Sequence, residues 1–497
     1  MPAFRIPALV TAGWRRPGLR GFLLNAAGNL VPLAAALVAL PVIAHLAGSE
    51  RLGMLGLAWT LIGYLGLLDF GLSRIVVRRV ARATTEQTLS GEADLVVRLC
   101  LWLGVGVIPA ALLIAWLLPS DTLASGSLTS DELRPALWLL LAALPAVIVT
   151  GLLRGVLEGQ QRFAIANAVK VLLGLWSFGA PAVVAVWLPT LPALVGAVVV
   201  GRLVGVLLHA WVIREFLARR LAHDGPRVAF GPLVREGGWL TVSNVVGPLM
   251  VTFDRFAIGA VLSLKAVAYY MVPQEFALRV LTLPMALSST AFPMLARRTL
   301  DGTAAQRQDL AGRSVMAALV LSLLPSLVMA AAAEPALRLW MGAEFADASA
   351  APAAILAVGL FANCVAQIPF TALQAAGRAD VTGRVHLVEV PIYVALLALA
   401  LSVGGFTGAA VVWTLRTAAD AVAMFWLAQR LRLMTLGRND RRALFAAAAL
   451  VASVAAAAVL LDGGVFVALV VVAGSIATFM SVRVAMRLLA MPAPRTE

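Results

Sequence analysis

The stretch FLLNAAGNLVPLAAALVALPVIAHLA, residues 22–47, decides the fold class of this chain. It contains no Asp, Glu, Lys or Arg, and a transmembrane helix needs about 20 predominantly apolar residues. The stretch is also too long for the apolar core of a cleaved signal peptide, which has about 7 to 15 residues. We therefore interpret it as the first membrane span.

Apolar stretches of this kind recur along the whole chain. The 497 residues are 61% hydrophobic and 13% charged, with a mean hydropathy of +0.94, whereas an ordinary soluble domain is about 45–50% apolar and about 25% charged. This composition excludes a water-soluble globule and predicts an all-α polytopic membrane protein. Charge clusters and Pro/Gly breaks predict about fourteen transmembrane helices, at 22–46, 52–73, 95–118, 135–156, 167–188, 191–213, 237–262, 267–295, 312–333, 350–374, 385–403, 407–429, 443–461 and 464–486.

The basic residues are distributed unequally between the two sets of alternate loops. Of the 39 Lys and Arg residues, 31 lie in one set together with the termini, and four lie in the opposite set, at Arg51, Arg134, Lys265 and Arg338. Cytoplasmic loops carry the excess of Lys and Arg in membrane proteins. We therefore predict that both termini are cytoplasmic, and the net charge of +14 does not indicate nucleic-acid binding.

Weak internal repeats relate each helix to the helix six positions later, at offsets of 212 to 216 residues. One example is Leu157-Glu158 with Arg162, which matches Leu373-Gln374 with Arg378. Two halves of one orientation are a recurrent transporter plan. We predict an N-lobe at 1–214, a cytoplasmic linker at 215–236, a C-lobe at 237–430, and peripheral helices with a cytoplasmic tail at 431–497.

Motifs of soluble enzymes and metal sites are not found in the sequence. Cys100 and Cys364 are the only cysteines, and Lys170 and Lys265 the only lysines. A disulfide framework and a Walker-type nucleotide site are therefore excluded. We predict no catalytic residue, no metal site and no cofactor.

Ionisable residues inside apolar segments are the candidate site residues, since such groups are costly at mid-bilayer and normally face a cavity or a partner. Asp254, Arg255, Glu275 and Arg279 lie 10 to 14 residues from Lys265 on either side. At a rise of about 1.5 Å per residue the four share roughly one depth in a helical hairpin. They are predicted either to line a site or to form a structural ion network.

Five further polar residues are weaker candidates. Arg416 and Asp420 have i,i+4 spacing and could neutralise each other, whereas Arg202 has no obvious local acid and is predicted to line a cavity. Asn25, Asn29 and Asn244 are predicted to be cavity polar groups or partners in hydrogen bonds between helices.

Loosely conserved-looking motifs spread over the chain resemble those of bacterial polysaccharide transporters of the Wzx type, which belong to the multidrug/oligosaccharidyl-lipid/polysaccharide exporter (MOP) superfamily. The matching segments are LAGSERLG at 46–53, LLDFGL at 67–72, LRGVLEGQQRF at 153–163, FDRFAIG at 253–259, Tyr269-Tyr270, Pro273, Phe292-Pro293 and LQAAGR at 373–378.

This resemblance implies two six-helix lobes of the MATE type with a peripheral helix pair. It also implies alternating access that carries an undecaprenyl-diphosphate-linked oligosaccharide across the bacterial inner membrane, coupled to a proton or sodium. On that basis Arg255, Arg279, Arg202 and Arg416 are candidates for binding the diphosphate or acidic sugars, because guanidinium groups can bind phosphate oxygens bidentately. Asp254, Glu275 and Asp420 are candidates for coupling or charge balance.

Three alternatives stay open from the sequence. A MATE-like small-molecule exporter and a peptidoglycan-precursor flippase fit the same fold. A membrane glycosyltransferase or polymerase is the alternative from another class, although the longest outer loops, at 119–134 and 334–349, leave little room for such an active site. Membrane lipids and other polysaccharide-assembly proteins are the expected partners.

Overall fold

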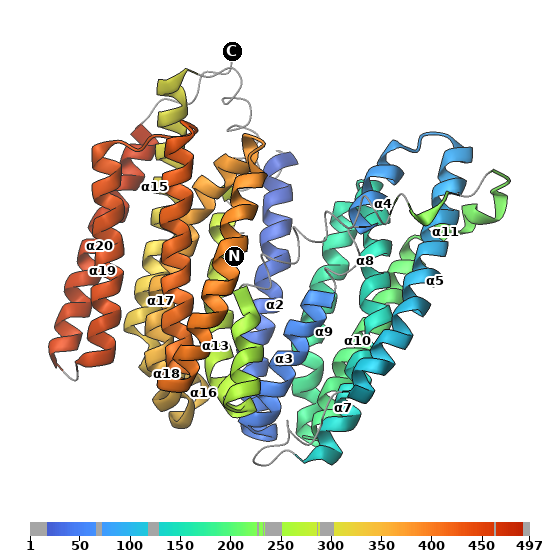
Figure 1. The fold of residues 1–497 in the computed structure, drawn as a ribbon, viewed down its shortest axis with the longest axis horizontal. Helices are drawn as coiled ribbons and strands as arrows, with labels where there is room; N and C mark the ends of the chain where they lie inside the picture. Colours follow the sequence, from blue (N-terminus) through green and yellow to red (C-terminus); the bar gives the residue numbers. More distant parts are fainter. Residues whose placement is uncertain are drawn as a thin grey trace, which may run out of the picture. The chain divides into compact units, whose positions relative to one another are not determined.

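The structure, a computed structural model, describes residues 17–65, 72–117, 129–225, 228–231, 233, 251–285, 287–288, 303–461 and 464–490. These residues form helices and turns, and no strand occurs among them. The chain divides into two compact units, Met1–Phe253 and Asp254–Glu497, which Figure 1 shows in colours that follow the sequence. The predicted lobe and linker boundaries, with the linker at 215–236, stay a prediction.

Unit 1 is built from eight longer helices and two short ones in its described part. These elements are α2 (Pro17–Ala47), α3 (Ser49–Leu65), α4 (Leu72–Arg82), α5 (Glu86–Leu117), α7 (Ser130–Ala142), α8 (Leu144–Gly159), α9 (Phe163–Trp187), α10 (Leu191–Val212), α11 (Arg214–Ala218) and the 3-10 helix η1 (Arg219–Ala222).

Ion pairs join the helix ends of unit 1 in two separate groups. Arg51 at the start of α3 binds Glu132 at the start of α7 at 2.6 Å, and the same carboxylate accepts the backbone N–H of Leu191 at the start of α10. At η1, Arg220 lies 3.3 Å from Asp94 of α5, and Arg79 of α4 binds Glu92 of α5. Segments that the charge distribution assigned to one side of the membrane thus lie together.

Two predicted loop regions are helical. The basic segment 74–98 forms α4 and the first part of α5, and the outer segment 334–349 contains the short helix α16 (Ala333–Met341). The predicted helix 135–156 is observed as α7 and α8, which meet at Ala143. Pro145 at the start of α8 has no N–H for the carbonyl of the preceding turn, which accounts for the break.

Glycines on α8 allow close packing against α4. A Cβ added to Gly155 would lie 2.9 Å from the Ser73 carbonyl oxygen, and one added to Gly159 would lie 2.9 Å from that of Val77. Real Cβ atoms essentially never approach this closely, so the helices can meet only where the side chains are hydrogen atoms. The structure therefore gives this glycine stripe a packing role, as the spacing of four residues predicts.

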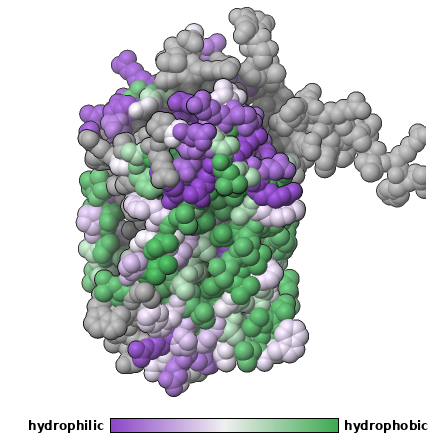
Figure 2. Space-filling model, turned by 90° about the vertical axis from the view of Figure 1, so that its right-hand side faces the viewer, coloured by the Kyte–Doolittle hydropathy of each residue, from purple (hydrophilic) through white to green (hydrophobic). Residues whose placement is uncertain are grey.

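The surface of unit 1 carries a hydrophobic band. Figure 2 shows hydrophobic side chains gathered through the middle of one face and hydrophilic ones gathered at its upper end. Large apolar side chains of α5 and α10 are exposed, among them Val105 (64%), Leu207 (69%) and Trp211 (62%). Contiguous exposed apolar surface of this kind marks contact with lipid or protein.

Unit 2 opens with the helical residues 254–261 and continues through longer helices. These are α13 (Leu264–Val280), α15 (Ala304–Ala331), α16, α17 (Ala343–Ala375), α18 (Ala379–Arg430), α19 (Arg438–Leu460) and α20 (Gly464–Ala490). The core pair is α17 and α18, while α19 packs on α15, α17 and α20.

The 52-residue element α18 is two helices joined at Gly405, whose φ of 56° and ψ of −145° are not helical. The break falls between the predicted helices 385–403 and 407–429, which it confirms. Seven helical stretches of the described residues are long and apolar enough to cross a membrane. Since one of the seven contains both halves of α18, the predicted number of fourteen helices is not a count that these stretches give, and it stays a prediction.

The same turn follows two segments that the sequence matched at an offset of 216 residues, Leu157–Arg162 and Leu373–Arg378. In each, the N–H of the sixth residue donates to the carbonyl of the first at 2.9 Å, and that of the fifth to the carbonyl of the second at 3.0 Å. The fifth residue is left-handed in both, with φ of 58° at Gln161 and 74° at Gly377. This is the Schellman pattern of helix ends, and it supports the repeat in the sequence.

Candidate functional site

A helical hairpin at the start of unit 2 holds most of the predicted site residues. Its first helix includes residues 254–261, and its second is α13. The turn between them ends at Ser263, whose hydroxyl accepts the backbone N–H of Ala266 at 3.1 Å and caps α13. The cap satisfies one of the N–H groups that a helix start leaves without a partner. The hairpin therefore has a fixed register in which residues of both helices face each other.

Arg255 lies at the centre of a group that we call the hairpin cluster, which comprises Asp254, Arg255, Tyr270, Gln274, Glu275 and Arg279. Its side chain is 2% exposed. The guanidinium donates from Nε to Gln274 Oε1 at 2.6 Å and from Nη1 to Glu275 Oε1 at 2.9 Å. This charge is thus held by two acceptors on the second helix of the hairpin.

Asp254 is fully buried and accepts hydrogen bonds from three groups. They are the hydroxyl of Tyr270, the amide Nε2 of Gln274 at 2.9 Å and the backbone N–H of Arg255 at 2.9 Å. A buried carboxylate is tolerated where it is hydrogen-bonded and its charge is compensated. Asp254 meets both conditions, which favours a structural role for it.

The opposite edge of the hairpin cluster is accessible. Glu275 is 24% exposed and Arg279 is 28% exposed, and Arg279 Nη2 lies 3.3 Å from Glu275 Oε2. This distance is long for a charge-assisted hydrogen bond, which is normally about 2.7–2.9 Å. Glu275 is thus shared between one buried and one accessible arginine, and the accessible guanidinium can reach a ligand.

The structure therefore brings together the four charged residues that the depth argument grouped. Sequence reasoning missed Tyr270 and Gln274, which complete the network. A signal for them existed, since the two have i,i+4 spacing on α13 and lie within the same depth range as Asp254.

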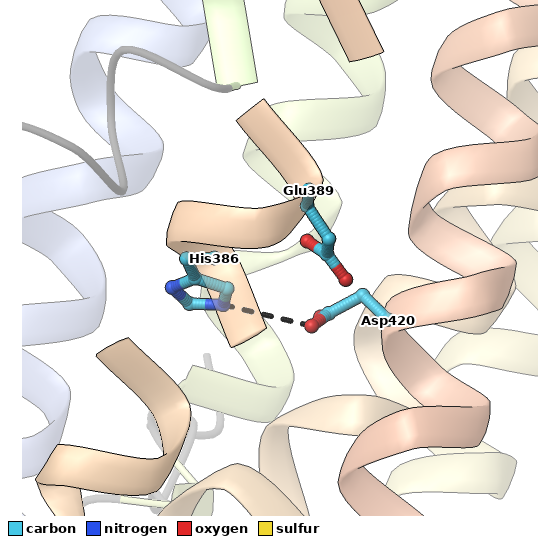
Figure 3. A group of neighbouring side chains, drawn as sticks. All are labelled: His386, Glu389 and Asp420. Carbon is cyan, nitrogen blue, oxygen red and sulfur yellow. Dashed lines mark ion pairs between the residues drawn. The ribbon is translucent and has the colours of Figure 1, made fainter. Parts of the chain in front are cut away.

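A second polar group lies where the two halves of α18 face each other. His386 and Glu389 come from the first half and Asp420 from the second, and their side chains point toward one another (Figure 3). One ligand atom of each lies within 4.8 Å of the others, with His386 Nε2 3.5 Å from Asp420 Oδ1. With Tyr393 and Arg416 they form what we call the α18 cluster. His386 and Glu389 were not among the predicted site residues.

Arg416 does not form the ion pair with Asp420 that the i,i+4 spacing allowed, so that possibility was wrong for these two described residues. Its guanidinium carbon lies 5.4 Å from the ring centroid of Tyr393 instead, and its buried Nε has no hydrogen-bond partner among the described residues. The cation–π contact with Tyr393 directs the guanidinium away from Asp420. Asp420 faces His386 in its place.

The two clusters adjoin within unit 2. Tyr393 is 2% exposed and Tyr270 is fully buried, and the two phenols lie close enough to interact electrostatically. Polar groups therefore continue from the hairpin through Tyr270 and Tyr393 to Arg416.

Arg202 lies on α10 of unit 1, apart from both clusters in the sequence. Its Nη2 donates to the hydroxyl of Ser177 on α9 at 3.1 Å, while its buried Nε has no hydrogen-bond partner in the described part of the chain. Asn25 and Asn29 lie on α2, but their side chains, like the whole of Asn244, lie outside the described residues. Their predicted roles, and that of Arg202 in a cavity, stay predictions.

Comparison with protein families gives a match over residues 19–298 to the family described as polysaccharide biosynthesis protein. A relative from Shigella flexneri named "Putative O-antigen transporter" is 29% identical over 413 residues, which cover 82% of this chain and 96% of the relative.

Two solved structures show the fold. The lipid II flippase MurJ in an inward closed conformation matches with a TM-score of 0.69 and 10% identity, covering 93% of this chain and 98% of MurJ. An inward-facing MATE transporter of the MOP superfamily matches with a TM-score of 0.65 and 13% identity, covering 82% and 98%. The predicted multi-pass membrane fold of the MATE type is confirmed, and the names of the relatives support a transporter over an enzyme.

Proposed function

Because the chain belongs to the polysaccharide biosynthesis protein family, we propose that it moves an undecaprenyl-diphosphate-linked oligosaccharide across the bacterial inner membrane. The cargo would enter from the cytoplasmic leaflet and leave to the outer leaflet by alternating access, with both termini cytoplasmic. The relative named for O-antigen transport and the likeness in fold to a lipid II flippase support a lipid-linked glycan as the cargo class.

The observation that carries the proposal is the accessible edge of the hairpin cluster. A diphosphate linkage carries concentrated negative charge, and an arginine fork binds phosphate oxygens bidentately. Arg279 is the partly exposed guanidinium of the cluster and its printed bond to Glu275 is long, at 3.3 Å. We assign diphosphate binding to Arg279, which would exchange this weak bond for bonds to the cargo.

The buried part of the cluster has a different role in this proposal. Arg255 is enclosed and bonded to Gln274 and Glu275, so it would have to break both bonds to touch cargo. We propose that it positions Glu275, and that Glu275 in turn orients Arg279 and balances its charge. Arg202, whose Nε has no hydrogen-bond partner in the described chain, is the candidate for a second anionic contact.

The alternative cargoes follow from different charge preferences. A cation exporter would favour acidic side chains without basic partners at its binding site. In the hairpin cluster two arginines accompany two acids, which favours an anionic cargo over a drug-like cation.

Deletion of the gene, with radiolabelled sugar to follow the lipid-linked repeat units, tests the proposal. The expected result is loss of surface glycan and accumulation of lipid-linked repeat units on the cytoplasmic side. Surface glycan that is unchanged in the deletion strain would contradict a flippase. Sugar transfer by the purified protein would favour the glycosyltransferase or polymerase alternative.

Substitution tests the assigned residue in the same strain. Arg279→Ala is expected to lower glycan export at least tenfold while the amount of protein in the membrane stays unchanged, and Arg279→Lys is expected to retain part of the export. Arg338→Ala is the matched control, because Arg338 is also ion-paired to a carboxylate i−4 along its helix but lies outside the cluster. Normal export by Arg279→Ala would rule out the diphosphate role.

A further inference from the structure

We infer that His386, Glu389 and Asp420 of the α18 cluster form a site that binds and releases one proton. The inference rests on the proposed function, because the bound proton would be the ion that drives the transport cycle. The three residues lie on the two halves of one helical element, so the charge state of the site acts on the packing of these halves.

The geometry provides a set of groups that can share a proton. His386 Nε2 is 3.5 Å from Asp420 Oδ1, and Glu389 places a carboxylate oxygen within 4.8 Å of the other ligand atoms. The Oε2 atom of Glu389 is buried and has no hydrogen-bond partner among the described residues. A protonated imidazole at His386 would face both carboxylates and draw them together.

The charge of the cluster indicates how many protons it takes. Carboxylates at Glu389 and Asp420 and the guanidinium of Arg416 leave a net charge of −1 when His386 is neutral. A net charge within a membrane-spanning segment is costly unless it is compensated. One proton on His386 makes the four groups neutral in sum, and release of that proton restores the negative charge.

The same arithmetic disfavours other cations. A divalent ion would leave the cluster with a net charge of +1, next to an arginine that is already in contact with Tyr393. A sodium ion would give neutrality, but hard cations prefer oxygen ligands, and the third group here is an imidazole. A proton fits both the charge and the chemistry of the residues.

The surroundings allow the imidazole to change its charge. His386 is 22% exposed and Asp420 is 20% exposed, so the site is reachable from outside the protein interior. Of the charged and titratable groups in the described part, Tyr393 and Arg416 of α18 and, through Tyr393, Tyr270 of α13 face the set. From α17 the ring of Phe370 stacks on His386, with centroids 6.2 Å apart, and fixes the orientation of the imidazole.

Charge movement on a solid-supported membrane tests the site without cargo. Proteoliposomes are exposed to a step in pH from about 7.5 to about 6.5, which brackets the usual histidine pKa of about 6.5. The wild-type protein is expected to give a transient charge displacement. Each of His386→Gln, Glu389→Gln and Asp420→Asn is expected to lower the displacement, by at least tenfold for His386→Gln.

His45→Gln is the matched control, because His45 is an exposed histidine of unit 1 that contacts only its own helix through the printed bond to Pro41 O. It is expected to keep the full displacement. A displacement that survives in all three α18 variants would overturn the proposal, as would a displacement that a sodium step at constant pH produces and Asp420→Asn abolishes. If His386→Gln does not fold, Asp420→Asn decides, since it keeps the size of the side chain.

The two proposals can fail separately. If the deletion strain exports glycan normally but the pH step gives a displacement that depends on His386, the cargo is wrong and the proton site stands. If glycan export depends on the protein but the displacement is the same in His386→Gln, the proton site is wrong and the cargo stands.

Discussion

The hairpin cluster and the α18 cluster adjoin in one unit but balance their charges in different ways. The hairpin cluster has two acids and two arginines, so its charges sum to zero, and its printed bonds run from 2.6 to 3.3 Å. The α18 cluster has one arginine for two acids, its histidine is 3.5 Å from Asp420, and its arginine contacts a ring. A balanced, bonded network resists change, whereas an unbalanced one responds to an added charge.

The largest expected effect of a single substitution is that of Asp254→Ala. It removes the acceptor of Tyr270 and Gln274 and the acid next to buried Arg255. Removing one partner of a buried charge network costs about 3 to 5 kcal/mol. We expect a loss of this size in the free energy of unfolding, measured by thermal or denaturant unfolding in detergent. Asp254→Asn, which keeps an acceptor oxygen, is expected to lose less.

Asp420→Ala is the matching change in the α18 cluster, where the acid is 20% exposed. It is expected to cost less than about 1 kcal/mol, as partly exposed ion pairs contribute little. Equal losses in Asp254→Ala and Asp420→Ala would show that the two clusters do not differ in the way described.

The hydrophobic pattern was enough to predict the fold class, because the membrane requires long apolar helices whatever their sequence detail. It also placed the break at Gly405. It did not predict that the basic segment 74–98 is helical, since charged residues were used as markers of loops, although a helix can continue beyond the apolar region.

The candidate site was only partly predictable. Depth along a hairpin depends on the helical rise alone, so residues 254, 255, 275 and 279 could be grouped from their distance to the turn. Side-chain direction depends on packing, so the sequence did not show that Arg416 contacts Tyr393 instead of Asp420. The partnership of His386 with Asp420 was missed because it joins the two halves of α18 far from Gly405.

Arg255→Lys tests how much the hairpin cluster depends on the shape of the arginine. The guanidinium binds Gln274 and Glu275 through two different nitrogens, and a lysine offers one compact ammonium instead of a fork. We expect a loss of about 1.5 to 3 kcal/mol in unfolding free energy, the size of one charge-assisted hydrogen bond. Arg279→Lys, at the accessible edge, is the control and should change stability by less than about 0.5 kcal/mol.

Glu389→Gln is expected to change the free energy of unfolding by less than about 1 kcal/mol, in the stabilising direction. The buried Oε2 of Glu389 has no hydrogen-bond partner in the described chain, and a buried charge is costlier than a neutral amide. Unfolding in detergent at pH 7 measures the change. Glu275→Gln should go the other way, because it removes the acceptor charge of two arginines. A destabilised Glu389→Gln protein would mean that this carboxylate is well compensated.

The smallest effect is expected at the contact between the clusters. Tyr393→Phe keeps the ring that Arg416 contacts and removes only the hydroxyl, so we expect a change of less than about 0.5 kcal/mol in unfolding free energy, since the cation–π contact needs only the ring face. Tyr270→Phe also removes only a hydroxyl, but that hydroxyl donates to buried Asp254, and loss of such a donor costs about 1 to 3 kcal/mol. If the two variants lose the same stability, the tyrosines act as one network, and the balanced cluster extends into α18. If Tyr270→Phe alone is destabilised, the rigid network ends at Tyr270.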